Sequence, residues 1–577
     1  MTTFKRLLAK SSDTSDTPRG AETLPGHTAN VLAAAEALLN GTADAQLRAV
    51  GLPLSAWSLR FRRTVLLAAF CHDLGKANDQ FQTMVRHQRK EQQAIRHEAL
   101  SLLLVQETEL RAWLTTALDS AETLDFLLWA AAGHHRKFPP PDPTAGTGIR
   151  LSLFLGHADF QRTLGIGAKW LSLSSPPSLC DVTWQLTGFS APQRRLRQLE
   201  VQASRYWATC SDEQRRFLAA VKACLIAADV AGSALPKEGE KITLWIKEAL
   251  QRQPTPEQLE KIVTDRLQGV SPRPFQAALG NTTARVVLAQ AGCGSGKTIG
   301  AYLWAARRAP GKRLFFSYPT TGTATEGFRD YLIDPTLDTQ LIHGRAAVDL
   351  DLLGVDDENE REDPLAALET WSTLITSCTV DTVLGLTQNR RRGLYAWPAL
   401  VNAAFIFDEI HAYDERLFGA LLRFLSNCLG VPCLLMTASL PRARREAIEK
   451  VLRTLGESLE VVTGPADLEA LPRYRRLLSD DPWSVVTQAL NQGEKVLWVV
   501  NTVDRALKLA DEASSRNLHP LVYHSRFRYE DRVRQHGRVI AAFRDDGPVL
   551  AVATQVAEMS LDLSADLLVT DLGMGKN

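Results

Sequence analysis

The chain has 577 residues, enough for three or four domains, and its 66 lysines and arginines nearly balance its 65 aspartates and glutamates. This balance excludes a globally basic surface, so any nucleic-acid site must be a local groove. The eight cysteines never form a CxxC pair, which argues against a disulfide framework and against a cysteine zinc site.

The N-terminal twenty-odd residues are rich in Ser, Thr and Asp and lack an apolar core, so no secretion signal is predicted. We also expect no apolar stretch long enough to cross a bilayer. Together with the cysteine pattern, these features predict a cytoplasmic protein with no membrane partner.

The first part of the chain has the pattern of a helical domain. From about Gly26 to Ala234, apolar residues recur at helical spacing and β-branched runs are few. The Pro- and Gly-rich segment Lys137–Gly148 is predicted to be a loop. We therefore predict an all-α domain over residues 1–245.

The hydrophobic pattern of the sequence changes at about Arg285, where short apolar runs begin to alternate with longer polar or amphipathic segments. This pattern predicts a buried parallel sheet with crossover helices. Domain boundaries are predicted near Pro236–Pro274 and near Gly464–Trp483, which gives a multidomain protein with α/β domains over 246–465 and 466–577. The runs expected to be strands are "RVVLAQAG", "RLFFSYP", "TLITSC", "AAFIFDEIH", "VPCLLMTAS", "KVLWVVN", "PLVYHS", "PVLAVAT" and "DLLVTDLG".

Potential metal ligands stand mostly at the ends of the predicted helices. A single His-Asp pair is better explained by a capped helix terminus than by a metal site, but five such elements in one helical domain favour a metal site. A mixed nitrogen and oxygen set suits Mn, Fe, Co, Ni or Zn better than Mg alone. The candidate ligands are His27, His72, Asp73, His97, His134, His135 and Asp229.

The adjacent His72 and Asp73 could serve two metal ions if the carboxylate of Asp73 bridges them. Two ions roughly 3.5–4 Å apart hold the attacking and leaving oxygens of a phosphodiester in two-metal sites. Lys76 lies one helical turn after Asp73, where it could meet a phosphate as a point charge. A solvated surface lysine is the alternative for Lys76.

A glycine-rich turn, "AQAGCGSGKT", directly follows the predicted strand "RVVLAQ". Its backbone N–H groups are expected to converge on the phosphates of ATP, while the lysine reaches the β and γ oxygens and the threonine binds Mg²⁺. The predicted ATP-binding residues of this turn are Gly292, Gly294, Ser295, Gly296, Lys297 and Thr298.

The second nucleotide element is "FIFDEIHAYD", in which a buried strand delivers Asp408 and Glu409 to its carboxyl end. Asp408 is predicted to hold Mg²⁺ and Glu409 to orient the attacking water. Adjacent buried carboxylates are costly without a cation, so a purely structural explanation is poor.

The order of these motifs resembles two known patterns. The histidines and aspartates of the first domain resemble the HD phosphohydrolases, and the paired histidine with the late "AD…S" resembles the HD nuclease of CRISPR-associated helicase–nucleases of type I systems. The resemblance implies one ion at His27, His72, Asp73 and Asp229, and a second at His97, His134 and His135, with Asp73 between them. Mn, Fe, Co and Ni are the expected metals. It also implies that Ser233 lies near the substrate, and a serine that merely ends a helix is the alternative.

The second part of the chain resembles superfamily 2 helicases with two RecA-like domains. In that family Gln276, in "RPFQ", falls where a glutamine reads adenine. The segments Tyr318–Phe328, Thr376–Gly385, Thr437–Pro441 and Tyr523–Phe527 resemble further helicase motifs, as does "ATQVAEMSLDLSADLLVTDL". The family's Gln-Arg-x-Gly-Arg motif does not follow "VTDLGMGKN", so we expect an incomplete second RecA-like domain and weak or absent ATP-driven unwinding.

The family resemblance implies an ATP-dependent DNA helicase and metal-dependent single-stranded DNA endonuclease that acts in type I interference. Its implied partners are single-stranded DNA and an RNA-guided type I surveillance complex. Two alternatives stay open: an HD-type nucleotide phosphohydrolase, and a non-catalytic remnant that only binds DNA. Comparing single-stranded DNA with nucleotides as substrates, and measuring metal content, would separate the three.

Overall fold

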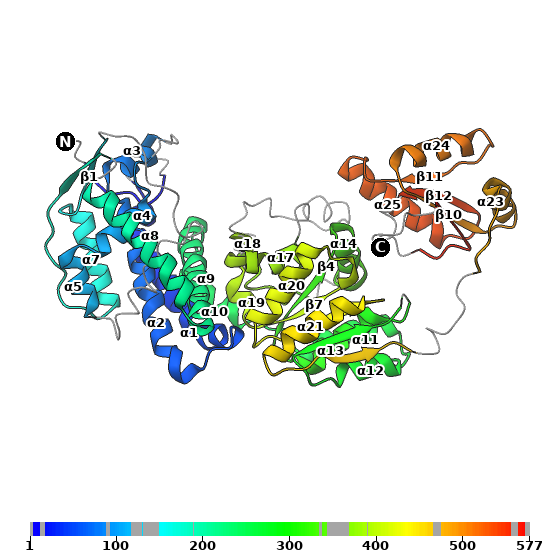
Figure 1. Cartoon of the computed structure of the whole chain (residues 1–577), viewed down its shortest axis with the longest axis horizontal. Helices are drawn as coiled ribbons and strands as arrows, with labels where there is room; N and C mark the ends of the chain where they lie inside the picture. The colour runs from blue at the N-terminus through cyan, green and yellow to red at the C-terminus, as the bar shows by residue number, and fades with distance from the viewer. Residues whose placement is uncertain are drawn as a thin grey trace.

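The protein folds into a helical lobe, a central lobe built on a large sheet, and a smaller C-terminal sheet lobe (Figure 1). The computed structural model describes residues 4–11, 18–87, 93–116, 130, 149–187, 190–292, 294–333, 337–342, 368–388, 391–465, 475–554 and 563–571. The predicted fold class, a helical domain followed by α/β domains, is confirmed.

The helical lobe is built around three long helices that pack on one another, α1 (Leu24–Ala49), α2 (Leu54–Cys71) and α9 (Asp212–Ala234). Helix α9 begins with a capping box, in which Ser211 and Gln214 satisfy each other's backbone N–H groups. The shorter helices are η1 (Gly20–Glu22), η2 (Leu74–Lys76), α3 (Asp79–His87), α4 (His97–Val105), α5 (Thr108–Thr115), α7 (Ala158–Trp170), α8 (Ala191–Thr209), η3 (Leu235–Glu238) and α10 (Ile242–Gln251).

An antiparallel hairpin in this lobe was not predicted. Strands β1 (Ile149–Leu153) and β2 (Val182–Leu186) pair with Leu151 opposite Trp184. They are separated by α7, so no tight-turn signal marks the pairing in the sequence. The predicted loop at residues 137–148 lies outside the described residues.

One helical stretch contradicts the expectation that nothing in the sequence could span a bilayer. Asp212–Glu238 is long and apolar enough to do so, but 78% of its most apolar window is buried inside the protein. A core helix of a globular domain passes the same test of length and composition, and α9 packs against α1 and α2 as such a helix does.

The central lobe contains a seven-stranded parallel sheet in the order β5-β6-β4-β7-β8-β3-β9. Its strands are β3 (Val286–Gln290), β4 (Arg313–Tyr318), β5 (Thr339–Ile342), β6 (Ile375–Thr379), β7 (Ala403–Phe407), β8 (Cys433–Thr437) and β9 (Glu460–Thr463). Its helices are α11 (Pro256–Leu267), α12 (Pro274–Gly280), α13 (Lys297–Arg308), α14 (Thr321–Tyr331), α17 (Val380–Leu384), η4 (Gly385–Gln388), α18 (Arg391–Tyr395), α19 (Trp397–Leu400), η5 (Ile410–Ala412), α20 (Glu415–Asn427) and α21 (Arg442–Thr454).

The C-terminal lobe contains a four-stranded parallel sheet in the order β11-β12-β10-β13. Its strands are β10 (Lys495–Val500), β11 (Leu521–Tyr523), β12 (Val549–Thr554) and β13 (Leu567–Thr570), and its helices are α23 (Pro482–Asn491), α24 (Val503–Ser514) and α25 (Tyr529–Arg544). His536 on α25 contacts Glu326 on α14, which joins this lobe to the central one.

Each of the nine apolar runs predicted to be strands contains one. The central strands β7 and β8 are buried along their whole length, which explains why an unbroken apolar run marks them. Strands β5 and β9, the two edge strands of the central sheet, were not predicted from the sequence. Both are short and only partly buried, so they carry mixed residues in place of an apolar run.

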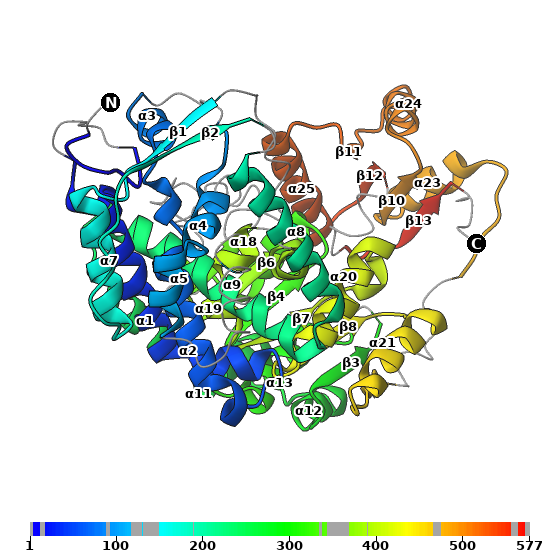
Figure 2. The ribbon, with the colours of Figure 1, turned by 60° about the vertical axis from the view of Figure 1, so that its left-hand side comes forward.

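The helical and central lobes share one apolar core. Leu288 and Phe315 of the central sheet belong to the same buried cluster as Phe70 and Leu225 of the helical lobe. Helices α18 and α19 lie beside α9 in both Figure 1 and Figure 2. This shared core makes a rigid junction between the two lobes.

A buried hydrogen bond crosses this junction, and removing its donor is expected to destabilise it. Trp397 Nε1 donates to Gln46 Oε1 at 2.8 Å, and both side chains are buried. Trp397→Phe leaves that oxygen without its donor, which costs about 1–3 kcal/mol of unfolding free energy. Thermal unfolding measures the loss, with the exposed Trp207→Phe as the matched control. Equal melting temperatures for the two variants would contradict the prediction.

Candidate metal centre and nucleotide site

Three elements of the helical lobe deliver the candidate ligands to one point. His27 stands in the first turn of α1, which begins at Leu24 because Thr23 caps it and Pro25 suits its first turn. His72 and Asp73 follow directly on α2, where the chain leaves the α-helix for η2. Asp229 stands near the end of α9.

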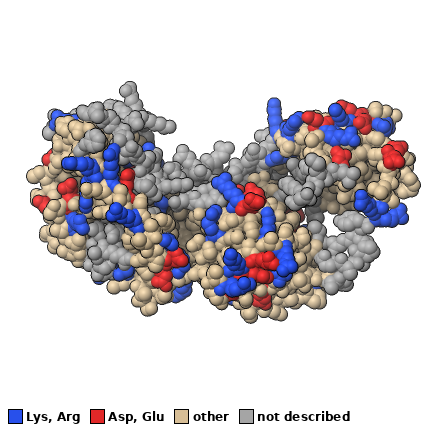
Figure 3. Space-filling model, viewed as in Figure 1, with Lys and Arg blue, Asp and Glu red and all other residues tan. Residues whose placement is uncertain are grey.

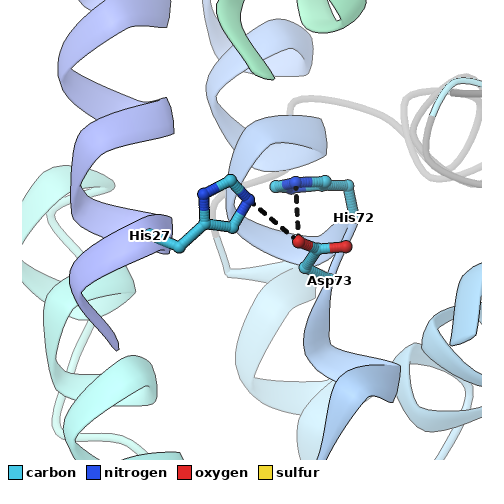
Figure 4. Close-up of side chains that lie close together, drawn as sticks. All are labelled: His27, His72 and Asp73. Carbon is cyan, nitrogen blue, oxygen red and sulfur yellow. Dashed lines mark ion pairs between the residues drawn. The ribbon is translucent and has the colours of Figure 1, made fainter. Parts of the chain in front are cut away.

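The polar atoms of His27, His72 and Asp73 converge (Figure 4). His27 Nε2 lies 3.0 Å from Asp73 Oδ2, and His72 Nε2 lies 3.3 Å from the same oxygen. Asp229 Oδ1 lies 3.3 Å from His27 Nε2 and 3.8 Å from His72 Nε2. One potential ligand atom from each of His27, His72 and Asp73 lies within 4.8 Å of the other two, and all three residues are buried.

The tautomer of His72 is set by its second ring nitrogen. His72 Nδ1 lies 2.8 Å from the carbonyl oxygen of Ala69, which can only accept a hydrogen bond. In the neutral ring Nδ1 therefore carries the proton and Nε2 presents a lone pair to the carboxylates. This is how metal-binding histidines are commonly oriented.

His97 approaches Asp73 from the other side. Its Nε2 lies 3.6 Å from Asp73 Oδ1, whereas His27 and His72 face Oδ2. The position of His97 depends on a close contact between η2 and α4, where Gly75 N donates to Ser101 Oγ at 2.8 Å and Ser101 Oγ donates to the His72 carbonyl at 2.9 Å.

Gly75 allows this contact, and a larger residue is expected to displace His97. A Cβ on Gly75 would lie 2.2 Å from the His97 carbonyl oxygen and 2.6 Å from Ser101 N, both backbone atoms. Gly75→Ala should therefore weaken Mn²⁺ binding about tenfold or more. Equilibrium titration with Mn²⁺ measures this, and Gly165→Ala is the control because nothing lies within 4 Å of its added Cβ. Unchanged Mn²⁺ affinity in Gly75→Ala would contradict the prediction.

The charges at this centre stabilise ionised carboxylates. Burial alone would raise the pKa of Asp73 and of Asp229, but the neighbouring histidines and lysines hold both pKa values well below the ordinary range. Burial also lowers the pKa of His72, and Asp73 and Asp229 outweigh it to give a raised pKa. Lys76 Nζ pairs with Asp73 Oδ2 at 2.6 Å and is buried, so Lys76 is not a solvated surface lysine.

The residues present fit a metal ion. His27 is buried, and neither of its ring nitrogens has a hydrogen-bond partner among the described residues, although Nε2 points at two carboxylates. Buried nitrogen and carboxylate ligand atoms that converge on one point form the mixed ligand set that a transition-metal ion prefers. Ser233 Oγ donates to Asp229 Oδ1 at 3.3 Å. His134 and His135 lie outside the described residues, so the second ligand set stays a prediction.

The glycine-rich turn forms a loop between β3 and α13. Gly294 and Gly296 have φ angles of +74° and +82°, a conformation that glycine adopts without strain. Ser295 Oγ donates to the Gly292 carbonyl at 2.7 Å, and Lys297 Nζ donates to the Ala291 carbonyl at 2.8 Å. Lys297 opens α13, and Thr298 follows it at the helix N-terminus, which is the position where phosphates bind.

Asp408 and Glu409 follow β7, and Lys297 faces them from the glycine-rich turn. Lys297 Nζ lies 3.8 Å from Glu409 Oε1. Glu409 has a φ of +45°, an uncommon conformation for a residue with a side chain and one that concentrates at functional sites. His411 Nδ1 contacts both Glu409 Oε2 at 3.0 Å and Thr437 Oγ1 at 3.1 Å, which connects this motif to the end of β8.

Gln276, which was predicted to contact adenine, is buried, and its side-chain amide is hydrogen-bonded within the protein. Its Nε2 donates to the Gly296 carbonyl at 3.1 Å, and its Oε1 accepts from Arg273 N at 2.8 Å. Arg273 Nη1 also donates to the Gly294 carbonyl at 2.8 Å. Both residues therefore brace the glycine-rich turn. Arg273 was not predicted from the sequence, and its place three residues before Gln276 was the available signal.

Asp408 makes the nucleotide-free protein sensitive to pH. Burial and then the charge of Glu409 raise the pKa of Asp408 to about 7. Because an unfolded aspartate titrates near about 3.9, the native state binds more protons between these values, and stability should fall as pH rises through them. Asp408→Asn should therefore be more stable than wild type at pH 8, by about 4 kcal/mol, and nearly equal to it at pH 4.

Urea unfolding at both pH values without Mg²⁺ measures this difference. The control is Asp265→Asn, which changes an exposed carboxylate in the same lobe. A difference between Asp408→Asn and wild type that is the same at pH 4 and pH 8 would contradict the prediction.

The fold and the two sites define a class of protein, a helical HD-type domain joined to a RecA-like helicase core. Family models agree: the HD domain of Cas3 matches residues 8–234, the DEAD/DEAH box helicase matches 273–447, and the C-terminal part of the CRISPR-associated nuclease/helicase Cas3 matches 492–574. A relative from Myxococcus xanthus, named as a CRISPR-associated nuclease/helicase Cas3, is 50% identical over 99% of this chain and 78% of its own length. The chain belongs to the Cas3 family of CRISPR-associated nuclease/helicases.

Solved structures show the same fold. The crystal structure of T. fusca Cas3 superposes with a TM-score of 0.60 at 19% identity, covering 98% of this chain and 71% of that one. A chain of a CRISPR RNA-guided surveillance complex in a pre-nicking state gives a TM-score of 0.56 at 18% identity, covering 98% of this chain and 69% of that one. HD and helicase domains of these kinds generally use divalent metals and ATP with Mg.

Proposed function

We propose that the helical lobe is a metal-dependent endonuclease for single-stranded DNA and that the sheet lobes form an ATP-binding helicase core with weak or absent unwinding, acting in type I interference. The observation that carries the nuclease is the division of histidines around Asp73. His27 and His72 face Oδ2, and His97 faces Oδ1. One carboxylate with ligands on both sides is the arrangement of a bridged two-metal centre.

The resemblance to HD nucleases supports the proposed roles of individual residues. His27, His72, Asp73 and Asp229 would hold one ion, and His97 with His134 and His135 the other, with Mn, Fe, Co or Ni as the expected metals. When bound, the ions would activate water and stabilise the charged phosphodiester oxygens. Lys76 holds Asp73 in its ionised form, and Ser233 orients Asp229.

The motor site would work through residues on three elements. Gly292, Gly294, Ser295, Gly296 and Lys297 would bind the phosphates of ATP, and Thr298 with Asp408 would hold Mg²⁺. Glu409 would orient the attacking water, and His411 would connect it to Thr437. Gln276 would contact adenine after releasing its hydrogen bond to Gly296.

We propose an RNA-guided type I surveillance complex as the partner and the cytoplasm as the location. All seven cysteines among the described residues are free, as expected in a reducing compartment. Basic and acidic side chains are intermingled on the face shown in Figure 3, so this face does not offer a purely basic surface to a partner.

Purified protein supplied with Mn²⁺, Co²⁺ or Ni²⁺ tests the nuclease. We expect cleavage of single-stranded DNA that EDTA abolishes, with deoxynucleotides left intact. Hydrolysis of deoxynucleotides without DNA cleavage would replace the proposal with a nucleotide phosphohydrolase. A folded protein that binds DNA but retains no transition metal would replace it with a DNA-binding role.

A further inference from the structure

The segment Phe4–Ser11, here called the N-terminal strap, is fixed against the helical lobe. Arg6 Nε pairs with Asp159 Oδ2 at 2.9 Å, and the same oxygen accepts from Leu7 N at 2.8 Å. Leu8 exchanges two hydrogen bonds with Gln82, at 2.9 and 2.8 Å. The backbone of the strap is therefore anchored on both α7 and α3.

The strap runs beside the metal centre. The carbonyl of Ala9 accepts a hydrogen bond from Lys76 Nζ at 3.1 Å, and Lys76 is the lysine that pairs with Asp73. Ala9 N donates to the Glu22 carbonyl at 2.8 Å, just before α1 and His27. The residue after Ala9 is Lys10, whose backbone is thus held between the two ligand-bearing elements.

The side chain of Lys10 is half-buried, and its backbone N–H donates to the Glu22 carbonyl at 3.4 Å, just before α1. Among the described residues its ammonium makes no hydrogen bond and no ion pair within 4.0 Å, whereas the Lys76 ammonium is paired with Asp73 at 2.6 Å. The charged groups that act on Lys10 are Asp229, Lys76, Asp73 and Lys237, and burial lowers the pKa of Lys10 to about 8.

A half-buried cation without a partner is costly, and an anion that enters the site would relieve that cost. The substrate that such a centre would receive carries an anion at every nucleotide. Lys76 is less suited to bind such an anion, because its ammonium is already paired with Asp73. The same ammonium also donates a hydrogen bond to the Ala9 carbonyl of the strap.

We propose that Lys10 binds a phosphate of the single-stranded DNA at the metal centre and thereby positions the strand for cleavage. The inference rests on the proposed nuclease function. It adds a DNA-binding residue from a part of the chain that lies outside the candidate ligand set, and it gives the N-terminal strap a role in substrate binding.

The test compares Lys10→Met with Lys5→Met in the full chain. Methionine keeps the aliphatic stem and removes the charge, and Lys5 is an exposed lysine of the same strap. We expect Lys10→Met to raise KM for single-stranded DNA about tenfold with Mn²⁺ present, to leave kcat within a few-fold, and to be rescued by Lys10→Arg. Lys5→Met should match wild type.

Two measurements without catalysis separate DNA binding from an effect on the metal ligands. Fluorescence anisotropy with an oligothymidylate in EDTA should show that the slope of log K against log[KCl] falls by about 0.7 in Lys10→Met, the value for one lost phosphate contact on a single strand. Mn²⁺ affinity of the DNA-free protein should be unchanged.

Two outcomes would overturn the inference. One is a Lys10→Met protein that is indistinguishable from Lys5→Met in KM and salt slope. The other is an unchanged salt slope with altered Mn²⁺ affinity, which would mean that Lys10 only adjusts the charge at Asp229. A wild-type protein that fails to cleave single-stranded DNA would instead refute the proposed function, so the two failures are distinguishable. A thermal melt confirms that each variant is folded.

Discussion

Asp73→Asn is expected to abolish metal-dependent DNA cleavage. Asp73 is the residue that both groups of histidines face, so its loss removes a ligand from each expected ion. Replacing an outer-shell partner of a metal ligand already costs about 10- to 100-fold in affinity or activity, and loss of the ligand itself should exceed about 100-fold. Mn²⁺ per chain and the rate of oligonucleotide cleavage measure the effect.

The same substitution leaves Lys76 buried without its carboxylate. Breaking one side of a buried ion pair costs about 3–5 kcal/mol, so Asp73→Asn alone could unfold the lobe. The double variant Asp73→Asn/Lys76→Met removes both partners and keeps the test valid. Asp44→Asn, an exposed carboxylate on α1, is the matched control. Full Mn²⁺ binding and normal cleavage by the double variant would refute the metal centre.

Lys297→Ala is expected to weaken ATP binding by between about 10- and 100-fold, because a charge-assisted hydrogen bond contributes about 1.5–3 kcal/mol. In the nucleotide-free state Lys297 donates to the Ala291 carbonyl and lies near Glu409, so it is held at the glycine-rich turn that would receive the phosphates. A fluorescent ATP analogue with Mg²⁺ measures the affinity, and Lys261→Ala, an exposed lysine of the same lobe, is the control.

The two substitutions should act on separate activities. Lys297→Ala should leave ATP-independent cleavage of single-stranded DNA unchanged, since Lys297 lies in the central lobe and the metal centre in the helical lobe. Asp73→Asn should leave ATP affinity unchanged for the same reason. ATP affinity in Lys297→Ala equal to that of Lys261→Ala would show that the glycine-rich turn does not bind nucleotide.

Much of the fold could be read from local patterns. Fully buried strands such as β7 and β8 carry unbroken apolar runs, and capping residues such as Thr23 and Ser211 mark helix starts. The hairpin β1–β2 and the edge strands β5 and β9 were missed. Their pairing depends on distant partners or on partial burial, and neither leaves a period in the sequence.

The metal centre also combines features that could be predicted from the sequence with features that could not. The sequence indicated His27, His72, Asp73, His97 and Asp229 as potential ligands, and the structure brings all five together. It did not indicate that Lys76 would be buried against Asp73, nor that the strap that carries Lys10 would run beside the centre. Both facts depend on the path of the N-terminal strap over α3 and α7.

The sequence by itself determined the types of chemistry in this protein, because ligand residues and a glycine-rich turn are chemical requirements that appear as residue types at short spacings. Only the tertiary structure decided which oxygen of Asp73 each histidine faces and which lysine pairs with that aspartate. Those properties depend on contacts between elements far apart in the chain, such as Gly75 against α4 and Ala9 against Lys76, and no local pattern encodes them.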